Sequence, residues 1–169
     1  MSKSLLPILR YPHNMLRQVA TVVEVFDSEL SQLAANMVFT MRHAQGIGLA
    51  APQVGRSIRL ITVDKLPGCP SLWTGLHQVL VNPEITGSSS YALSSEEKCL
   101  SFPKGSADIA RPPVIKIKYQ DLLGHVEEVE VCDLASRCIQ HEVDHLNGIT
   151  LAHYMSPSKR KRLYGVAYD

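Results

Sequence analysis

The sequence predicts an α+β fold in which antiparallel sheets pack around a central helix carrying HEVDH, with a further helix at the C-terminus. Helical and strand-like segments are segregated along the chain and do not alternate as βαβ units, which favours this class over α/β. The strand-like segments alternate only partly between apolar and polar residues. Half-buried antiparallel strands produce such a pattern.

The composition indicates a single domain spanning residues 1–169, because this length supports one core but hardly two. The 17 Lys and Arg residues nearly balance the 16 Asp and Glu residues, so no global field attracts DNA or an anionic membrane. The N-terminus lacks the apolar stretch of a secretory signal, and no apolar run approaches the roughly 20 residues that span a bilayer. The four cysteines form no CxxC pair. We therefore expect a cytoplasmic protein without a disulfide framework.

The first predicted element is a helix capped by Asp27 or Ser28. Its apolar residues recur at helical spacing from Leu30 to Met41, and Gly46 supplies a stop signal. Four strand-like runs come next, separated by loops rich in Gly, Pro and Ser. These runs are 58–64, 79–85, 114–121 and 126–131.

Two more helices are predicted in the C-terminal part of the chain. One has Asp133 as its cap, carries LASRCIQHEVDHL and ends at Asn147-Gly148, a common exit pair. The other begins at Ser156, with Pro157 in its first turn.

The sequence HEVDH predicts a metal site on the first of these two helices. His141 and His145 are four residues apart, so their imidazoles project from one helix face and can bind the same ion. Glu142 flanks that site, where a carboxylate can take a proton from a metal-activated water. Cys138 and Leu134 precede them on the same face and would line the wall. The alternative is that these polar residues simply share a solvated helix face.

A catalytic site of this kind usually has a third protein ligand. Cys99, between carboxylates and an apolar pair in SEEKCLSFP, is the leading candidate, although a free cysteine can also be ordinary core filling. Cys132 and Cys138 compete with it, and Cys69 sits in a Gly/Pro loop without a supporting pattern.

Three segments together resemble peptide deformylase: GIGLAAPQ at 46–53, EKCLS at 97–101 and QHEVDHLNG at 140–148. The N-terminal ILRYPHNMLRQVA is similar to that family's opening as well. The resemblance implies a metallohydrolase that removes the formyl group from the N-terminal formylmethionine of nascent polypeptides and releases formate. It also implies one divalent metal per chain, natively Fe(II), with Zn, Ni or Co able to replace it.

The resemblance further implies roles for the matching residues. The metal ligands would be Cys99, His141 and His145. Glu142 would act as general base and then acid, while the Gln53 side chain and the Leu100 backbone N–H would stabilise the oxyanion. Ile47 and Gly48 would offer main-chain hydrogen bonds to the substrate. The methionine pocket would use Leu134, Cys138 and, at its mouth, Glu97, and an ion pair between Arg111 and Asp144 would steady the ligand helix.

The segment from Gly46 to Ala51 also fits the dinucleotide fingerprint G-x-G-x-x-G/A. That motif requires a strand before it and a helix after it. Here a helix precedes the segment, and Pro52 interrupts any helix directly after it, so contact with a peptide backbone is the better interpretation.

Lys98 departs from the family pattern, because the usual segment is EGCLS. The lysine either points outward from an extended strand or narrows and charges the cleft. The alternative function is therefore a deformylase-like metalloprotein with altered substrate range or without catalysis.

Three further alternatives concern other functions. An HExxH endopeptidase hydrolyses its substrate by the same kind of metal-assisted mechanism, but its third metal ligand is normally His or Glu. A noncatalytic module could hold a metal for structure alone, although structural zinc normally has four protein ligands. The basic run 159–162 is either a solvated helix face or a contact for ribosomal RNA phosphates. The histidines at 13, 43, 77, 125 and 153 show no ligand spacing.

Overall fold

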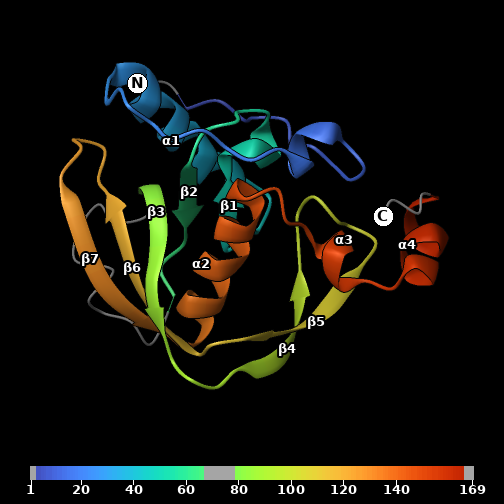
Figure 1. Cartoon of the computed structure of the whole chain (residues 1–169). Coiled ribbons are helices and arrows are strands. Elements are labelled where there is room, and N and C mark those ends of the chain that lie inside the picture. Colours follow the sequence, from blue (N-terminus) through green and yellow to red (C-terminus); the bar gives the residue numbers. More distant parts are fainter. Residues whose placement is uncertain (1–2, 67–78, 166–169) are drawn as a thin grey trace.

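The computed structural model describes residues 3–66 and 79–165 (Figure 1). Its helices are α1 (Ser28–His43), α2 (Asp133–Leu146), α3 (Leu151–Tyr154) and α4 (Pro157–Tyr164), with 3-10 turns η1 (Asn14–Arg17) and η2 (Ala51–Val54). Its strands are β1 (Gly48–Ala50), β2 (Leu60–Val63), β3 (Val79–Ser88), β4 (Leu93–Lys98), β5 (Ser106–Arg111), β6 (Val114–Gln120) and β7 (Val126–Cys132).

The strands form two antiparallel sheets, one of five strands in the order β1-β2-β3-β6-β7 and one of two strands, β4-β5. Helix α2 lies between the larger sheet and the β4–β5 hairpin (Figure 1). The predicted α+β class and the central position of the HEVDH helix are therefore confirmed.

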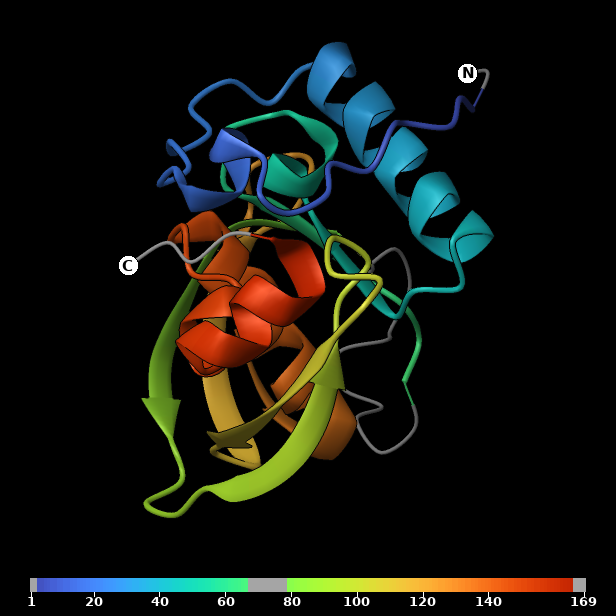
Figure 2. The same ribbon diagram turned by 90° about the vertical axis from the view of Figure 1, so that its right-hand side faces the viewer.

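The first predicted helix forms as α1, and its start is fixed by one hydrogen bond. The Asp27 carboxylate accepts from the Leu30 N–H at 2.9 Å, so Asp27 is the cap and Ser28 the first helical residue. Beyond its end, the Gly46 N–H donates to the Met41 carbonyl. The N-terminal segment runs along α1, where the Leu6 N–H donates to Thr40 Oγ1 at 2.9 Å (Figure 2).

The predicted cap of α2 is wrong by one residue. Cys132 occupies the N-cap position, and Asp133 is the first residue of the helix, with a φ of 51°. Among the described residues, no side chain caps this end of the helix by a hydrogen bond. The Asp133 N–H donates to the Pro113 carbonyl at 2.7 Å. The predicted exit is confirmed, because the helix ends at Leu146 and Gly148 adopts a φ of 72°.

The last helix begins as expected. Ser156 caps α4 by accepting from the Lys159 N–H at 3.3 Å, and Pro157 is its first residue. Helix α4 lies beside the connection between β4 and β5, where Lys159 Nζ donates to the Ser106 carbonyl at 2.8 Å (Figure 2).

All four predicted strands exist, although β3 extends to Ser88 and β2 is shorter than expected. Sequence reasoning missed β1, β4, β5 and the short helix α3. Strand β4, LSSEEK, is exposed along nearly its whole length, so no apolar alternation marks it. Strand β1 has only three residues.

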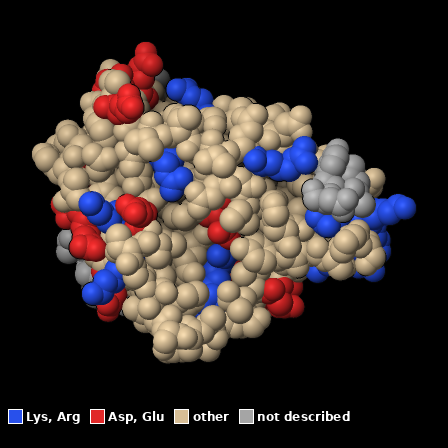
Figure 3. Space-filling model, in the orientation of Figure 1, with Lys and Arg blue, Asp and Glu red and all other residues tan. Residues whose placement is uncertain are grey.

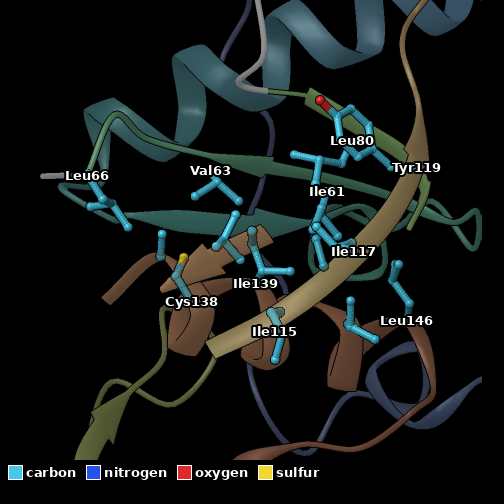
Figure 4. Packing of buried hydrophobic residues seen from close by; sticks show 14 of the residues in the cluster. Ile61, Val63, Leu66, Leu80, Ile115, Ile117, Tyr119, Cys138, Ile139 and Leu146 are labelled. Atoms are coloured by element: carbon cyan, nitrogen blue, oxygen red, sulfur yellow. The ribbon is translucent and has the colours of Figure 1, made fainter. Parts of the chain in front are cut away.

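The main core packs the apolar side of α2 against the large sheet. Ile139 and Leu146 are fully buried and contact a cluster that includes Ile61 and Ile117. Figure 4 shows Cys138, Ile139 and Leu146 of α2 facing the side chains of the sheet. This packing holds one side of the helix rigidly and leaves its histidine side free to face the β4–β5 hairpin.

The cysteines in the described part of the chain are Cys99, Cys132 and Cys138, and all three are free thiols. Cys69 and His77 lie outside the described residues. Within residues 3–66 and 79–165, no helix is both long and apolar enough to cross a bilayer.

Candidate metal centre

Three side chains far apart in the sequence meet beside α2. Ligating atoms of Cys99, His141 and His145 all lie within 4.8 Å of one another. Cys99 Sγ is 3.2 Å from His145 Nε2, and the two imidazole centroids are 5.1 Å apart at an interplanar angle of 74°. The predicted triad therefore comes together, with Cys99 supplied by the β4–β5 connection. Of the competing thiols, Cys132 and Cys138 lie outside the triad, and Cys69 is not described.

Glu97 fixes the orientation of His141. Its Oε2 lies 2.9 Å from His141 Nδ1, which leaves Nε2 to face the site. The carboxylate also accepts from Arg111 at 2.7 Å and from Arg137 at 2.8 Å. Glu97, which the resemblance implied at the mouth of the methionine pocket, lines the cleft but is only 5% exposed, and its carboxylate is engaged with these partners. The contacts are those of a positioning residue.

The predicted ion pair between Arg111 and Asp144 is present, with 2.9 Å between Nη2 and Oδ2. The Tyr154 hydroxyl donates to the same carboxylate oxygen at 3.0 Å. Burial alone would raise the pKa of Glu97, but hydrogen bonds from His141 and Arg111 outweigh it and lower that pKa to about 2. The network therefore holds Glu97 ionised.

Sequence reasoning missed Arg137 and Tyr154. A signal existed for Arg137, since it precedes His141 by four residues and shares its helix face.

The pKa values of the two histidines are shifted in opposite directions. Burial lowers the pKa of His145 well below its ordinary value, so its imidazole is neutral, the form that binds a metal. Burial would also lower the pKa of His141, but hydrogen bonds with Cys99 and Glu97 outweigh it and raise that pKa.

Glu142 is buried beside the triad at 4% exposure, and no group in the described part of the chain pairs with its Oε2. Burial raises its pKa to about 7. A carboxyl group with this pKa can both accept and donate a proton near neutrality. Gly48 passes so close that an added Cβ would collide with Glu142 Oε1 and lie 2.7 Å from Cys138 Sγ.

Gln53 is buried in the turn η2, next to the Cys99 thiol. Its Oε1 accepts from the Ala50 N–H at 2.8 Å, which aims the amide nitrogen at the site. That nitrogen donates to Cys99 Sγ at 3.4 Å and to Ser101 Oγ at 3.1 Å. Sequence reasoning assigned no role to Ser101, although it lies within EKCLS. Leu100 lines the same cleft.

Cys99 and His141 of the triad line a cleft of about 860 Å³, while His145 lies buried behind them. Ile47 and Leu134 line it and are 42% and 44% exposed, while Gly48 and Cys138 lie deeper. Cys138 Sγ donates to the Ile47 carbonyl at 3.4 Å, and burial raises the pKa of this thiol well above its ordinary value. Cys138 is thus a neutral wall residue. Lys98 is exposed and also lines the cleft.

The donor set fits a single transition-metal ion. Two imidazoles and one thiol, here from His141, His145 and Cys99, suit Fe, Zn, Co or Ni. Three protein ligands leave one position for a small molecule, which is typical of catalytic sites. Glu142, whose Oε2 has no partner among the described residues, lines the same cleft as Cys99 and His141.

Fold and site together define a class: an antiparallel α+β metalloenzyme in which the histidines of an HExxH helix and one distant cysteine share an ion site. The sequence model described as polypeptide deformylase matches residues 5–161 of this chain. The chain belongs to the polypeptide deformylase family, which is metal-dependent.

Individual relatives agree over nearly the whole length. Peptide deformylase from Brucella suis biovar 1 is 40% identical over 161 residues, covering 93% of this chain and 88% of the relative. The enzyme from Acinetobacter baumannii strain SDF is 42% identical, covering 95% and 88%.

Solved structures match as well. Peptide deformylase from Thermotoga maritima has a TM-score of 0.81 at 37% identity, covering 91% of this chain and 99% of its own. The Ehrlichia chaffeensis enzyme in complex with actinonin has a TM-score of 0.86 at 32% identity, covering 96% and 95%. A class I type b enzyme from A. baumannii, described as Met-Ala-Ser bound, has a TM-score of 0.81 at 34% identity, covering 91% and 100%.

Proposed function

We propose that this chain hydrolyses the N-formyl group of the N-terminal formylmethionine of new polypeptides, releasing formate. The observation that carries the proposal is the convergence of Cys99, His141 and His145 beside the buried Glu142, whose Oε2 has no partner in residues 3–66 and 79–165. Family membership supports it. Met-Ala-Ser, bound in a relative, is the peptide that deformylation of formyl-Met-Ala-Ser would leave.

Cys99, His141 and His145 would hold one divalent ion, natively Fe(II), with Zn, Ni or Co able to substitute. When bound there, the ion supplies Lewis acidity that activates water and polarises the formyl carbonyl. Glu97 holds His141 in the required tautomer through the contact at Nδ1. A thiolate next to a redox-active ion is prone to oxidation, so the assay requires anaerobic handling.

Glu142 moves the proton in this mechanism. Its free Oε2 accepts a proton from the attacking water and later returns it to the departing amine. Its pKa of about 7 allows both transfers without a large thermodynamic penalty.

Gln53 and Leu100 would stabilise the negative charge that develops on the formyl oxygen. The Gln53 amide nitrogen already points at the site and needs only to exchange Cys99 or Ser101 for the oxyanion. We expect Gln53→Glu, which keeps the acceptor but removes the donor, to lower kcat about 100- to 1,000-fold. Unchanged metal content with an unchanged kcat would exclude Gln53 from this role.

The methionine of the substrate would occupy the inner cleft, against Leu134 and Cys138. The main chain of Ile47 and Gly48 would align its backbone, where Gly48 provides space next to Glu142. Glu97 lines the same cleft and contributes by orienting His141.

One anaerobic assay tests the central proposal. Formyl-Met-Ala-Ser and an unblocked protein are offered to the wild type and to Glu142→Ala, and metal content is measured on the same samples. We expect formate from the peptide with the wild type, and a loss of about 100- to 10,000-fold in Glu142→Ala with metal retained. The exposed Glu130→Gln on β7 is the matched control and keeps full activity.

The other outcomes identify the competing functions. Internal cleavage of the protein without formate would indicate an endopeptidase. Bound metal without either product in any variant would indicate a noncatalytic metalloprotein.

We also propose that α4 contacts ribosomal RNA and that the protein acts in the cytoplasm, where nascent chains emerge. Basic side chains gather over α4 at the right of Figure 3. Lys159 donates to the Ser106 carbonyl, so Arg160, Lys161 and Arg162 carry most of the proposed contact. Ribosome binding that keeps its strength and salt dependence after reversal of the charges at 159–162 would exclude it.

A further inference from the structure

The rim of the cleft carries three exposed cations: Arg10, Lys98 and Lys104. None of the three forms an ion pair with any other residue that the structure describes. Arg137 also lines the cleft, but its guanidinium is bound to Glu97 and to the carbonyls of Ile109 and Leu93. The first three are therefore available to a ligand.

The fold brings these cations to the wall that supplies the thiol ligand. Lys98 ends β4, next to Cys99, and is paired with Ser106 across the hairpin. Lys104 lies in the connection between the two strands. Arg10 is held alongside, because the Leu9 N–H donates to the Gln53 carbonyl at 2.7 Å and the Tyr11 N–H donates to the Ser101 carbonyl at 3.0 Å.

Acidic residues of the cleft do not cancel this charge. Among the described acidic residues that line it, Glu97 and Glu142 are buried, and Glu97 is already paired with two arginines. Glu96 is exposed on the rim, where it accepts a hydrogen bond from the Ser106 hydroxyl at 2.6 Å. Three cations against one anion leave the rim positive.

We propose that this rim selects formylmethionyl peptides with an acidic side chain directly after the methionine, and that Lys98 is the main specificity-determining residue. This inference rests on the proposed function. A substrate whose formyl group reaches the buried triad must leave the cleft across the rim, so its next side chains pass the cations. Lys98 is exposed, lines the cleft and is the rim cation nearest in sequence to Cys99, so we assign it to the first of those side chains.

The size of the effect depends on exposure. A single solvent-exposed ion pair changes an equilibrium by a factor of about 1.4 to 5. Because more than one cation faces the substrate, we expect a total preference of about three- to tenfold. Salt at about 1 M reduces the Debye length to about 3 Å and should remove most of it.

The test compares two isosteric peptides, formyl-Met-Asp-Ala amide and formyl-Met-Asn-Ala amide. Their shape is nearly the same, and the C-terminal amide removes the only other carboxylate. The measured quantity is the ratio of kcat/KM for the Asp peptide to that for the Asn peptide, at low salt and at about 1 M salt. For the wild type at low salt we expect a ratio of about 3 to 10.

Lys98→Gln keeps most of the side-chain stem and should lower that ratio by a factor of about 2 to 5, while Lys98→Arg should preserve it. Lys116→Gln, an exposed position on β6 that does not line the cleft, is the matched control and leaves the ratio unchanged. The inference is overturned if the wild-type ratio is at or below one, or if Lys98→Gln has the same ratio as the wild type. In either case, formate release from the peptides still supports the proposed function. No formate from either peptide overturns both.

Discussion

At Gly48 the backbone passes so close to α2 that no β-carbon fits. The neighbours that an added methyl group would meet are the Glu142 carboxylate and the Cys138 sulfur, both of which belong to the cleft. The φ of Gly48 is not in the left-handed region, so backbone freedom is not the reason for a glycine here. The reason is the lack of space for a side chain.

Gly48→Ala therefore displaces Glu142, the proposed proton carrier. We expect kcat to fall at least about tenfold and the protein to lose about 1–3 kcal/mol of unfolding free energy from overpacking. Formate release and urea unfolding measure the two effects. Gly87→Ala on β3 is the control, because its Cβ would meet Lys116 no closer than 3.7 Å. Equal kinetics in the two variants would contradict the close approach.

At the scale of elements, Glu97 joins β4 to β5 and α2 through Arg111, Arg137 and His141. Buried charges are tolerated only when such partners surround them. This explains why the polar sequence LSSEEK forms a strand that periodicity did not predict. Apart from its pairing with β5, the buried side-chain contacts of β4 come from the inward-facing Glu97, not from an apolar stripe.

The network predicts a pH-dependent stability. The pKa of Glu97 is about 2 when folded, below its ordinary value of 4.5, so its contribution is present above pH 4.5 and lost as the pH falls towards 2. We expect Glu97→Gln to destabilise the metal-free protein by about 2–3 kcal/mol at neutral pH, and the difference to shrink near pH 2. Urea unfolding at several pH values measures it. The exposed Glu130→Gln should show a small difference at every pH, and a pH-independent difference for Glu97→Gln would contradict the network.

At the scale of the molecule, an ion bound by Cys99, His141 and His145 would fasten the β4–β5 hairpin to α2. Cys99 and the two histidines belong to elements that otherwise meet through the Glu97 network and through hydrogen bonds from Arg137 to the carbonyls of Leu93 and Ile109. A ligand that binds only the folded chain stabilises it by mass action.

Removing the metal with a chelator should abolish formate release and lower stability. Restoring the free ion to about 100 times its Kd should add about 2.7 kcal/mol to the unfolding free energy. Thermal melts with and without the ion measure this, and Cys99→Ser should respond much less. A wild-type melting temperature insensitive to the ion would argue against a site built from Cys99.

The sequence by itself determined the class of fold, α1, α2, α4, the long strands and the two histidines of the site. Each of these depends on local spacing: period 3.6 on a helix, caps such as Asp27 and Ser156, and side chains four residues apart. The HEVDH pattern also indicated Glu142, and the surroundings of Cys99 made it the leading third ligand. Family likeness of three short segments then favoured Cys99 over the other cysteines and added Gln53.

Only the tertiary structure decided how those segments meet. It brought Glu97 into contact with His141, put Lys98 on the same cleft as Arg10 and Lys104, and made Cys138 a neutral wall residue. Contacts between residues some 40 to 90 positions apart depend on packing and burial, as between Glu97 and His141 or between Ile47 and Cys138. Local sequence patterns do not encode burial at that range, because the same side chain is charged and solvated in one fold and buried and paired in another.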